Sequence, residues 1–597
     1  MMSDEYALND IANLVWASKY RLRGTGKDDN CIQETWDRVA EALSAVEPVA
    51  QSSWAQRFRY LLSECKFLPG GRILAGAGTG RNVTLFNCFV MGQIEDSMNG
   101  IFEALKEGAV TMQMGGGVGY DFSTLRPRGM PARRVGSTAS GPVSFMHIWD
   151  SMCATVLSSG FRRGAMMATL RCDHPDIETF ITAKQQQNVL RRFNLSVLVS
   201  DKLIQAVEND EDWSLLFPDP AAADGESVMS HWPGYDGAVR CRVFRRLKAR
   251  DLWHQIISAA YDYAEPGVLF IDRINQWNNL YYCEQITATN PCGEIPLQPY
   301  GCCNLGSINL TRFVREPFTS AARIDMHAIE EHVQIAVRLL DNVIECSLYP
   351  LPQQQDQASA TRRIGMGMTG LADTLIMLGL SYGENTGREM AARIMATICH
   401  RAYRSSIELA KEKGVFPLFD ADAYLQSPFI TSLPKDIVQG IKRYGLRNSH
   451  LLAIAPTGTI SLLAGNVSSG VEPVFAQSYS RRVMTETGER DVQLQDYAVQ
   501  RWQQKGEEGL PPFYTDASRL SPRQHLDMQA ALQPFVDNAI SKTVNVPQDC
   551  DFAMFESLYM DAYRVGLKGC TVFRPNPVSG AILQGCAPCE SAPVSPG

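Results

Sequence analysis

Short apolar runs alternate with amphipathic segments along the chain from about residue 66 to residue 570. Four of the runs are predicted to be buried strands, namely 194–200 (NLSVLVS), 267–272 (GVLFID), 451–456 (LLAIAP) and 542–547 (KTVNVP). Between such runs, apolar residues recur at helical spacing, as in Val333, Val337, Leu340 and Ile344. Strands that alternate with helices over such a length predict a parallel α/β sheet or barrel.

The two ends of the chain differ from this middle part. Residues 1–65 have the pattern of polar helices, and a second helical pattern around Ile394 and Ile398 is expected to stop at Gly414. Residues 573–597 hold prolines at positions 575, 577, 588, 593 and 596, which cannot continue a helix or a central strand. We therefore expect a helical N-terminal region (1–65), an α/β region (66–572) and a mobile tail (573–597).

Composition limits the classes of protein that need to be considered. The 597 residues are 45% hydrophobic and 20% charged, with a formal net charge of −8, which is typical of a soluble folded protein. No apolar run reaches the roughly 18 residues of a membrane span, and the first ten residues lack the pattern of a secretory signal. The negative net charge argues against a protein that coats nucleic acid. We expect a cytoplasmic protein with no membrane or nucleic-acid partner.

The 16 cysteines should mostly be reduced thiols in that compartment. Most stand alone in apolar or helical settings and are expected to be small buried hydrophobes. Four places differ by their sequence context: Cys88 after Leu-Phe-Asn, Cys292 in Asn-Pro-Cys-Gly-Glu, the adjacent pair Cys302–Cys303, and Cys586–Cys589 in the tail.

The segment 290–294 (NPCGE) places a cysteine between proline and glycine, which predicts a rigid, exposed loop tip. The carboxylate of Glu294 would raise the pKa of a nearby thiol, and no histidine lies beside Cys292 to form a thiolate. The group therefore fits a hydrolase poorly. It fits a cysteine that gives and takes a hydrogen atom, with Glu294 as base and Asn290 as a hydrogen-bonding positioner.

Two glycine-containing segments are candidates for close contact with a ligand. The run 115–119 (GGGVG) allows a close backbone approach, although such a run is more often a tight turn. The segment 456–461 (PTGTIS) follows a predicted strand and could hold a phosphate at the start of a helix. Neither segment matches the dinucleotide-binding or P-loop pattern. From the residues alone, each segment is therefore open to two interpretations, an ordinary turn or a ligand-binding loop.

Many segments, in order from about residue 10 to residue 577, resemble the catalytic subunit of ribonucleotide reductase, in particular the adenosylcobalamin-dependent (class II) type. They include 67–79 (FLPGGRILAGAGT), 86–92 (FNCFVMG), 112–128 (MQMGGGVGYDFSTLRPR), 290–295 (NPCGEI), 303–310 (CNLGSINL) and 469–482 (SGVEPVFAQSYSRR). The resemblance implies a ten-stranded α/β barrel around a central finger loop. It also implies reduction of ribonucleotides to 2′-deoxyribonucleotides, with diphosphates as the preferred substrates.

The resemblance also assigns roles to individual residues. Cys292 would become a thiyl radical that takes the 3′ hydrogen, Glu294 would accept the 3′-hydroxyl proton, and Asn290 would hold the sugar hydroxyls. Cys88 and Cys303 would supply two electrons as a dithiol, with Cys302 as a structural neighbour. The expected substrate-binding residues are Asn87, Gly117, Gly119, Pro456, Thr457, Gly458, Thr459, Ile460 and Ser461.

Partners follow from the same resemblance. Cys586 and Cys589 would carry electrons from thioredoxin or glutaredoxin to the Cys88–Cys303 disulfide. Half of a zinc site is the alternative, but no second pair of ligands accompanies them. Asp96, Ser97 and Arg126 match positions that bind a deoxynucleotide or ATP effector at the interface of a homodimer. The N-terminus lacks the basic segment of an ATP-cone.

The source of the radical separates the classes of this family. The segment 569–574 (GCTVFR) lacks the adjacent tyrosines expected of a subunit that receives a radical from a second protein. The tail also lacks a glycyl-radical motif, which leaves adenosylcobalamin as the expected cofactor. The segment 325–330 (DMHAIE) fails the D-x-H-x-x-G pattern, so no cobalamin-contacting residue and no metal ligand can be named. The alternatives are a class I catalytic subunit and an inactive nucleotide-binding or redox protein.

Overall fold

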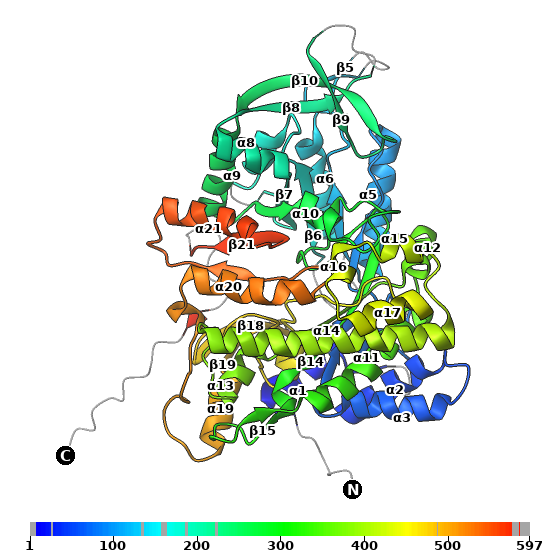
Figure 1. The fold of residues 1–597 in the computed structure, drawn as a ribbon, viewed down its shortest axis with the longest axis vertical. Coiled ribbons are helices and arrows are strands. Elements are labelled where there is room, and N and C mark those ends of the chain that lie inside the picture. The colour runs from blue at the N-terminus through cyan, green and yellow to red at the C-terminus, as the bar shows by residue number, and fades with distance from the viewer. Residues whose placement is uncertain are drawn as a thin grey trace, which may run out of the picture.

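A mixed sheet surrounded by helices forms the centre of the molecule in the computed structural model (Figure 1). The structure describes residues 8–24, 28–132, 137–156, 164–185, 189–220, 225–485, 488–575 and 584–585. None of the helices within these ranges has the length and apolar character needed to span a membrane.

The first half of the sheet consists of parallel strands with buried side chains. β2 (Cys88–Val90), β3 (Gly117–Asp121), β6 (Met166–Arg171), β7 (Phe193–Val199) and β11 (Gly267–Phe270) pair in this order. Most of their residues are buried on both faces, as parallel sheets require when helices cover them.

The second half is also parallel, and it runs antiparallel to the first. β14 (Cys302–Asn309) pairs with β17 (Ile364–Thr369), and β20 (Thr543–Asn545) pairs with β21 (Gly569–Phe573). Isolated bridges connect Met366 to Leu452 and Ile454 to Ile540, so residues 452–454 link β17 to the segment before β20. The halves meet where β14 pairs with β2 and where β11 pairs with β21.

These strands and β1 (Phe67–Pro69) belong to one ten-stranded sheet, which confirms the predicted α/β class and strand number. The predicted strand 451–456 is extended but makes only bridges. The reason is local: the backbone N–H groups of Leu451 and Leu452 donate to the Asp537 carboxylate, each at 2.8 Å, instead of to a neighbouring strand.

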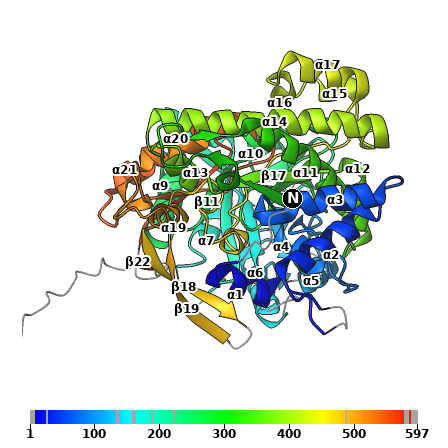
Figure 2. The same cartoon turned by 90° about the horizontal axis from the view of Figure 1, so that it is seen from below.

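Helices of the N-terminal region pack beside the ten-stranded sheet. α2 (Ile32–Ser44) and α3 (Gln51–Leu62) contact α11 (Met326–Cys346), as Figure 2 shows from below. The buried Arg338 of α11 donates to both carboxylate oxygens of Glu47, at 2.7 and 2.8 Å. The predicted apolar face of α11 is confirmed as buried, and α14 (Asn385–Lys413) ends at Gly414 as predicted, with φ +83°.

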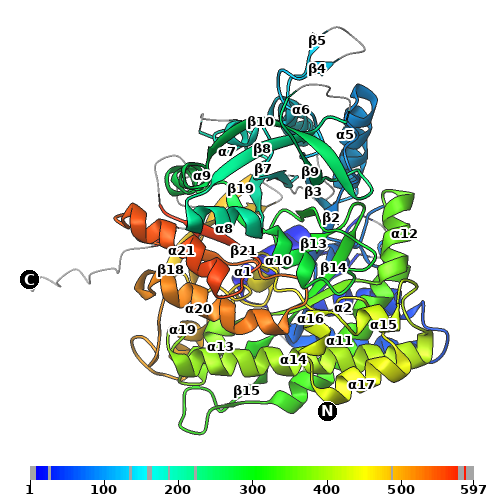
Figure 3. The same ribbon diagram turned by 45° about the horizontal axis from the view of Figure 1, so that its top comes forward.

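A second, smaller sheet lies at one end of the molecule. β8 (Asp212–Pro218), β10 (Ala238–Lys248) and β9 (Ser227–His231) form it, next to α5 (Met98–Gln113) and α6 (Pro142–Thr155) in Figure 3. Directly after β9, the Trp232 indole donates to the carbonyl of Ser123 at 3.0 Å. The next two residues, Pro233 and Gly234, line a cavity together with Asp121 at the end of β3.

Within the predicted tail, residues Gln584–Gly585 form strand β22. β22 pairs antiparallel with β18 (Ser478–Thr485), whose other neighbour is β19 (Gly488–Gln495) (Figure 2). The pairing is possible because the prolines at 577 and 588 leave residues 578–587 free of proline.

Candidate active site

The segment between β11 and β14 forms a narrow hairpin with the predicted cysteine loop at its tip. β12 (Ala288–Thr289) pairs with β13 (Pro296–Leu297), and residues 290–295 connect them. The Asn290 side chain closes the loop by accepting from the backbone N–H of Ile295 at 3.0 Å. Gly293 has φ +82°, a conformation that favours glycine. We call residues 284–300 the finger hairpin.

The tip exposes one residue and buries its neighbours. Cys292 is exposed, whereas Asn290 and Glu294 are each 2% exposed. The predicted loop tip with an accessible thiol is therefore present in the structure.

The two remaining cysteines of the predicted set lie directly opposite each other. Cys88 of β2 and Cys303 of β14 are paired residues of an antiparallel ladder, and both are buried. Paired residues in such a ladder have Cα atoms about 4.5–5.5 Å apart. That separation falls within the usual range of a disulfide, about 4.4–6.8 Å. The pair can therefore alternate between dithiol and disulfide without large movement of either strand.

Contacts between side chains join the finger hairpin to this pair. Asn290 Nδ2 lies 3.2 Å from Cys88 Sγ, and the Cys88 thiol lies 3.9 Å from Glu294 Oε1. The charges of Glu294, Cys303 and Cys292 all act on the Cys88 thiol. The structure thus brings all five predicted catalytic residues together, although their sequence positions span more than 200 residues.

Burial is the main reason that the pKa values of the buried thiols at this site are raised. It raises the pKa of the Cys88 thiol well above its usual range, and the Glu294 charge raises it further. Burial likewise raises the pKa of Cys303, against the opposing positive charge of Arg363. Both groups are protonated thiols at neutral pH, which suits hydrogen-atom and two-electron chemistry rather than thiolate attack.

Gly117 and Gly119 of β3 make room for the finger hairpin. A Cβ atom at Gly119 would collide with the Thr289 carbonyl oxygen, and one at Gly117 would lie 3.2 Å from the Pro291 ring. The neighbouring Asn87 accepts the Gly117 backbone N–H at 2.9 Å, and its buried Oδ1 has no hydrogen-bond partner. These residues line the place where the hairpin crosses the sheet.

The predicted phosphate loop follows the extended residues 451–454. Thr457 has φ +49°, and its hydroxyl accepts the Gly470 backbone N–H at 2.8 Å and contacts the Thr369 hydroxyl at 2.9 Å. Ser461 contacts Ser469 at 3.0 Å. The Arg481 guanidinium lies 3.6 Å from the position of a Cβ on Gly458, so a positive charge stands beside the loop. Thr459, Ile460 and Pro456 belong to the same turn.

The residues expected to bind an effector lie at the start of α5. Arg126 Nε donates to Asp96 Oδ2 at 2.7 Å, and both side chains are about one-third exposed. Ser97 caps α5 by accepting the Gly100 backbone N–H at 3.0 Å. On the same helix, Met98 and Phe102 are 58% and 47% exposed.

Cys586 and Cys589 lie outside the described residues. The adjacent strand β22 ends at Gly585, opposite Tyr479 of β18, and β18 also carries Arg481. The described part of the tail therefore reaches the strand that carries a positive charge to the predicted phosphate loop.

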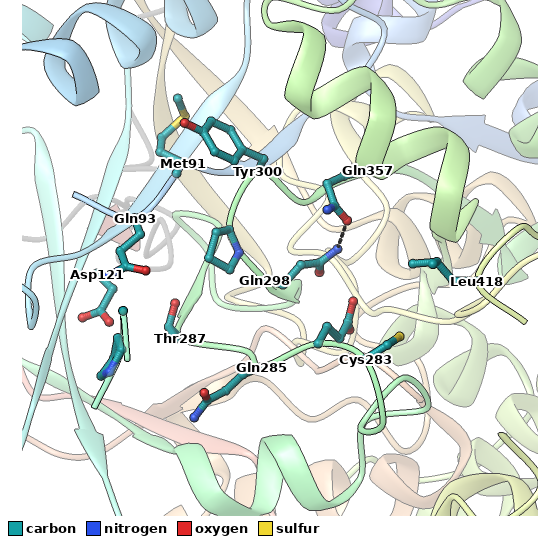
Figure 4. A pocket seen from close by; sticks show the side chains of 15 residues that line it. Met91, Gln93, Asp121, Cys283, Gln285, Thr287, Gln298, Tyr300, Gln357 and Leu418 are labelled. Carbon is teal, nitrogen blue, oxygen red and sulfur yellow. Dashed lines mark hydrogen bonds between the residues drawn. The ribbon is translucent and has the colours of Figure 1, made fainter. Parts of the chain in front are cut away.

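Sequence reasoning missed Arg363, which connects both arms of the finger hairpin. Its side chain is 1% exposed, donates to the Pro296 carbonyl at 2.9 Å and forms an ion pair with Glu284. The available signal was a charged residue directly before a fully apolar strand (RRIGMGMT, 362–369). It also missed Asp121 and Gln298, which line a cavity of about 440 Å³ at the base of the hairpin (Figure 4).

Comparison with known proteins agrees with this geometry. A family model described as the ribonucleotide reductase barrel domain matches residues 86–573, and one for the all-alpha domain of the same enzyme matches residues 6–82. The chain is 36% identical to the vitamin B12-dependent ribonucleoside-diphosphate reductase of Mycobacterium tuberculosis (strain CDC 1551), over 98% of this chain and 82% of the relative.

Two further relatives carry different descriptions. A vitamin B12-dependent ribonucleoside-diphosphate reductase from Thermoplasma acidophilum is 34% identical over 93% of this chain and 69% of its own length. A ribonucleoside-diphosphate reductase subunit alpha from Chlamydia pneumoniae is 25% identical over 89% of this chain and 56% of its own length. With the two domain models matched in order, the chain belongs to the ribonucleotide reductase family.

Proposed function

We propose that the protein reduces ribonucleoside diphosphates to 2′-deoxyribonucleoside diphosphates with adenosylcobalamin as cofactor. One observation carries the proposal: an accessible Cys292 shares a hairpin tip with buried Asn290 and Glu294, against the facing pair Cys88 and Cys303. The names of the Mycobacterium and Thermoplasma relatives support both the cofactor and the diphosphate substrate.

The chemistry assigns one task to each residue. Cys292, as a thiyl radical, takes the 3′ hydrogen of the ribose while Glu294 takes the proton of the 3′-hydroxyl. The 2′-hydroxyl leaves as water. Cys88 and Cys303 together give two hydrogen atoms, become a disulfide, and Cys292 returns the 3′ hydrogen. The sum is one C–OH and two thiols converted to one C–H, one water and one disulfide.

The raised pKa values of the Cys88 and Cys303 thiols are consistent with the transfer of hydrogen atoms from them. A thiol that keeps its proton can deliver a hydrogen atom, whereas a thiolate can deliver only an electron. The Asn290 amide near Cys88 and the Glu294 carboxylate hold the reacting groups of the chain in one small volume. Such fixed placement is the main advantage that a rigid hairpin offers catalysis.

Adenosylcobalamin, when bound, supplies the initiating radical by cleavage of its cobalt–carbon bond. The side chains fit such a cofactor at one place in particular. The cavity at the base of the finger hairpin is lined by the acceptor-bearing side chains of Asp121, Glu284 and Gln298. A cofactor whose rim carries carboxamide N–H groups matches these acceptors.

Each turnover leaves a Cys88–Cys303 disulfide that must be reduced again. We assign this to Cys586 and Cys589, with thioredoxin or glutaredoxin as the external source of electrons. The pairing of β22 with β18 supports the assignment, because it places Gly585, the residue before Cys586, on a strand beside the phosphate loop. The Cys586–Cys589 pair then works from the substrate side.

Regulation and assembly complete the proposal. Asp96, Ser97 and Arg126 form the site for a deoxynucleoside triphosphate or ATP effector, at the interface of a homodimer. The exposed Met98 and Phe102 beside this site support such an interface. The product is the precursor of DNA.

The test is anaerobic conversion of CDP to dCDP by this polypeptide alone, with dithiothreitol and effectors, and with or without adenosylcobalamin. Product only with the cofactor supports the proposal. Equal product without the cofactor, or no product until a second radical-generating protein is added, would contradict it. Cys292→Ser should be inactive, and Cys31→Ser, a change at an exposed cysteine away from the site, should retain activity.

A further inference from the structure

Strand β18 carries two adjacent arginines on opposite faces of the hairpin that it forms with β19 (Figure 2). Tyr479 and Val483 are only 8% and 7% exposed, so the face that they share with Arg481 packs against the rest of the molecule. Arg482 lies on the other face, where its guanidinium pairs with Asp491 at 3.3 Å. Arg481 is half-buried, and no carboxylate of the described residues forms an ion pair with it.

Hydrogen bonds hold this hairpin against the segment that follows the predicted phosphate loop. The Tyr479 hydroxyl donates to Asn466 Oδ1 at 2.8 Å, and Asn466 Nδ2 donates to the Gln495 carbonyl at 2.8 Å. The Asn466 backbone N–H in turn donates to the carbonyl of Ser461, the last residue of the loop, at 3.0 Å. These bonds fix β18 relative to the loop, and Arg481 is the next residue of β18 on the face of Tyr479.

The Arg481 guanidinium reaches the middle of the loop. Apart from the chain neighbours of Gly458, the only described atom within 4 Å of a Cβ built on that glycine is Arg481 Nη2, at 3.6 Å. Because glycine has no Cβ, this space between the guanidinium and the loop backbone is open. An anion held by the loop would therefore lie beside the guanidinium.

The loop itself has no charge with which to bind a phosphate. None of the residues 456–461 (PTGTIS) is charged. The Thr457 hydroxyl already accepts the Gly470 N–H, and the Ser461 hydroxyl already contacts that of Ser469. A guanidinium can bind a phosphate through two parallel N–H···O bonds, which adds both charge and geometric selection. Arg481 supplies what the loop lacks.

We propose that Arg481 binds the terminal phosphate of the ribonucleoside diphosphate and makes that phosphate the group by which the site selects its substrate. This inference rests on the proposed function. The loop then holds the inner phosphate, and a nucleoside monophosphate cannot make the contact with Arg481. The contact is remote from the reacting ribose and is the same in the bound substrate and during the reaction, so it lowers KM and leaves kcat unchanged.

Binding to the full chain can be measured without cofactor or turnover, by equilibrium dialysis for CDP and by ligand-observed NMR for the weaker ligand CMP. Arg481→Met keeps an unbranched side chain but removes the guanidinium. We expect its affinity for CDP to fall by about 10–100-fold, the usual effect of losing hydrogen bonds to a charged group, while its affinity for CMP is unchanged. Unchanged CMP binding also shows that the loop of the variant is folded.

Two further variants define the contact. Arg481→Lys keeps the positive charge without the two parallel donors, so its affinity for CDP should lie between those of the wild type and Arg481→Met. Arg482→Met is the matched control, because it removes the adjacent arginine from the opposite face of the same strand. It should match the wild type with both ligands. In turnover assays, Arg481→Met should raise KM for CDP by the same factor as the loss of affinity and should retain kcat.

Three results would overturn the inference. Equal CDP affinity of Arg481→Met and the wild type would show that the loop alone holds both phosphates. Parallel losses for CDP and CMP would show that Arg481 supports the fold of the loop and contacts no terminal phosphate. The same selective loss in Arg482→Met would show a general effect of charge on this hairpin. Failure of the wild-type protein to bind CDP at all would instead reject the proposed function, and this result is distinct from the other three.

Discussion

Glu294 is the residue at which the proposed acid–base step can be tested most directly. Glu294→Gln keeps the size and an oxygen for the Cys88 contact, but it cannot take a proton from the substrate. We expect turnover to fall by about 10²–10⁴-fold, the usual contribution of a general base, with nucleotide binding retained. Initial rates and equilibrium binding measure the two effects. A decrease of less than tenfold, or the same decrease in the exposed-site control Glu408→Gln, would contradict the assignment.

Asp121 gives a pH-dependent prediction for the cofactor-free protein. Burial raises the pKa of Asp121 to about 6 from its usual 3.8. The folded state therefore binds more protons than the unfolded state between these values, and stability falls as pH rises from about 4 to 6. Asp121→Asn removes the buried charge and should be more stable than the wild type at pH 8 by about 2 kcal/mol. Urea unfolding at pH 8 and pH 4.5 tests this, because the difference should fall to less than half at the lower pH, where only the unfolded-state carboxyl is still mostly ionised.

The residues that sequence could identify are those whose type and spacing carry the chemistry. Cys292, Glu294 and Asn290 stand within five positions, so their grouping was visible before folding. The roles of Cys88 and Cys303 came only from family likeness, because their contact depends on the register of β2 against β14. Asp121 and Gln298 gave no local signal, and Arg363 gave only that of a charge before an apolar segment, since each acts through burial and through partners distant in sequence.

At the scale of elements, the finger hairpin depends on one buried ion pair. Arg363 holds Glu284 on one arm and the Pro296 carbonyl on the other. Arg363→Met would leave the Glu284 charge buried without its partner, so we expect a loss of about 3–5 kcal/mol in stability. The double variant Arg363→Met with Glu284→Gln should regain most of it. A double-mutant cycle by urea unfolding measures the coupling, and purely additive losses would show that the pair does not clamp the hairpin.

The contact between β22 and β18 predicts a specific cross-link. Ser480 and Gln584 are direct partners in this antiparallel pair, with Cβ atoms about 5 Å apart. Ser480→Cys with Gln584→Cys should form a disulfide under mild oxidation, identified by peptide mapping. Arg482→Cys with Gln584→Cys lies two residues out of register, about 7–8 Å apart, and should not. Equal yields from both pairs would show that the tail does not occupy this edge.

A helix or strand was predicted correctly where burial of a repeated apolar pattern stabilises it, and was missed or misjudged where a partner distant in sequence determines it. The apolar faces of α11 and α14 were predictable, because a repeated spacing reports burial directly. The segment 451–456 was predicted as a regular strand from the same signal, but Asp537 captures its N–H groups, and no sequence pattern announces a partner more than 80 residues away. Strand β22 was hidden for a similar reason: its pairing strand lies about 100 residues earlier.

For the whole molecule, the surface of α5 connects assembly with regulation. Phe102 and Met98 are four residues apart on one exposed helix face, next to the Asp96–Arg126 pair. Exposed apolar side chains grouped in this way are typical of an interface.

Phe102→Glu places a charge there, and we expect sedimentation to show a dimer converted to a monomer. The monomer should lose the response of substrate choice to effectors, because the effector site is expected to need both subunits, while it retains unstimulated activity. Phe513→Glu, at another exposed phenylalanine, should stay dimeric. A monomeric wild-type protein, or a Phe102→Glu dimer with normal effector response, would place the regulatory interface elsewhere.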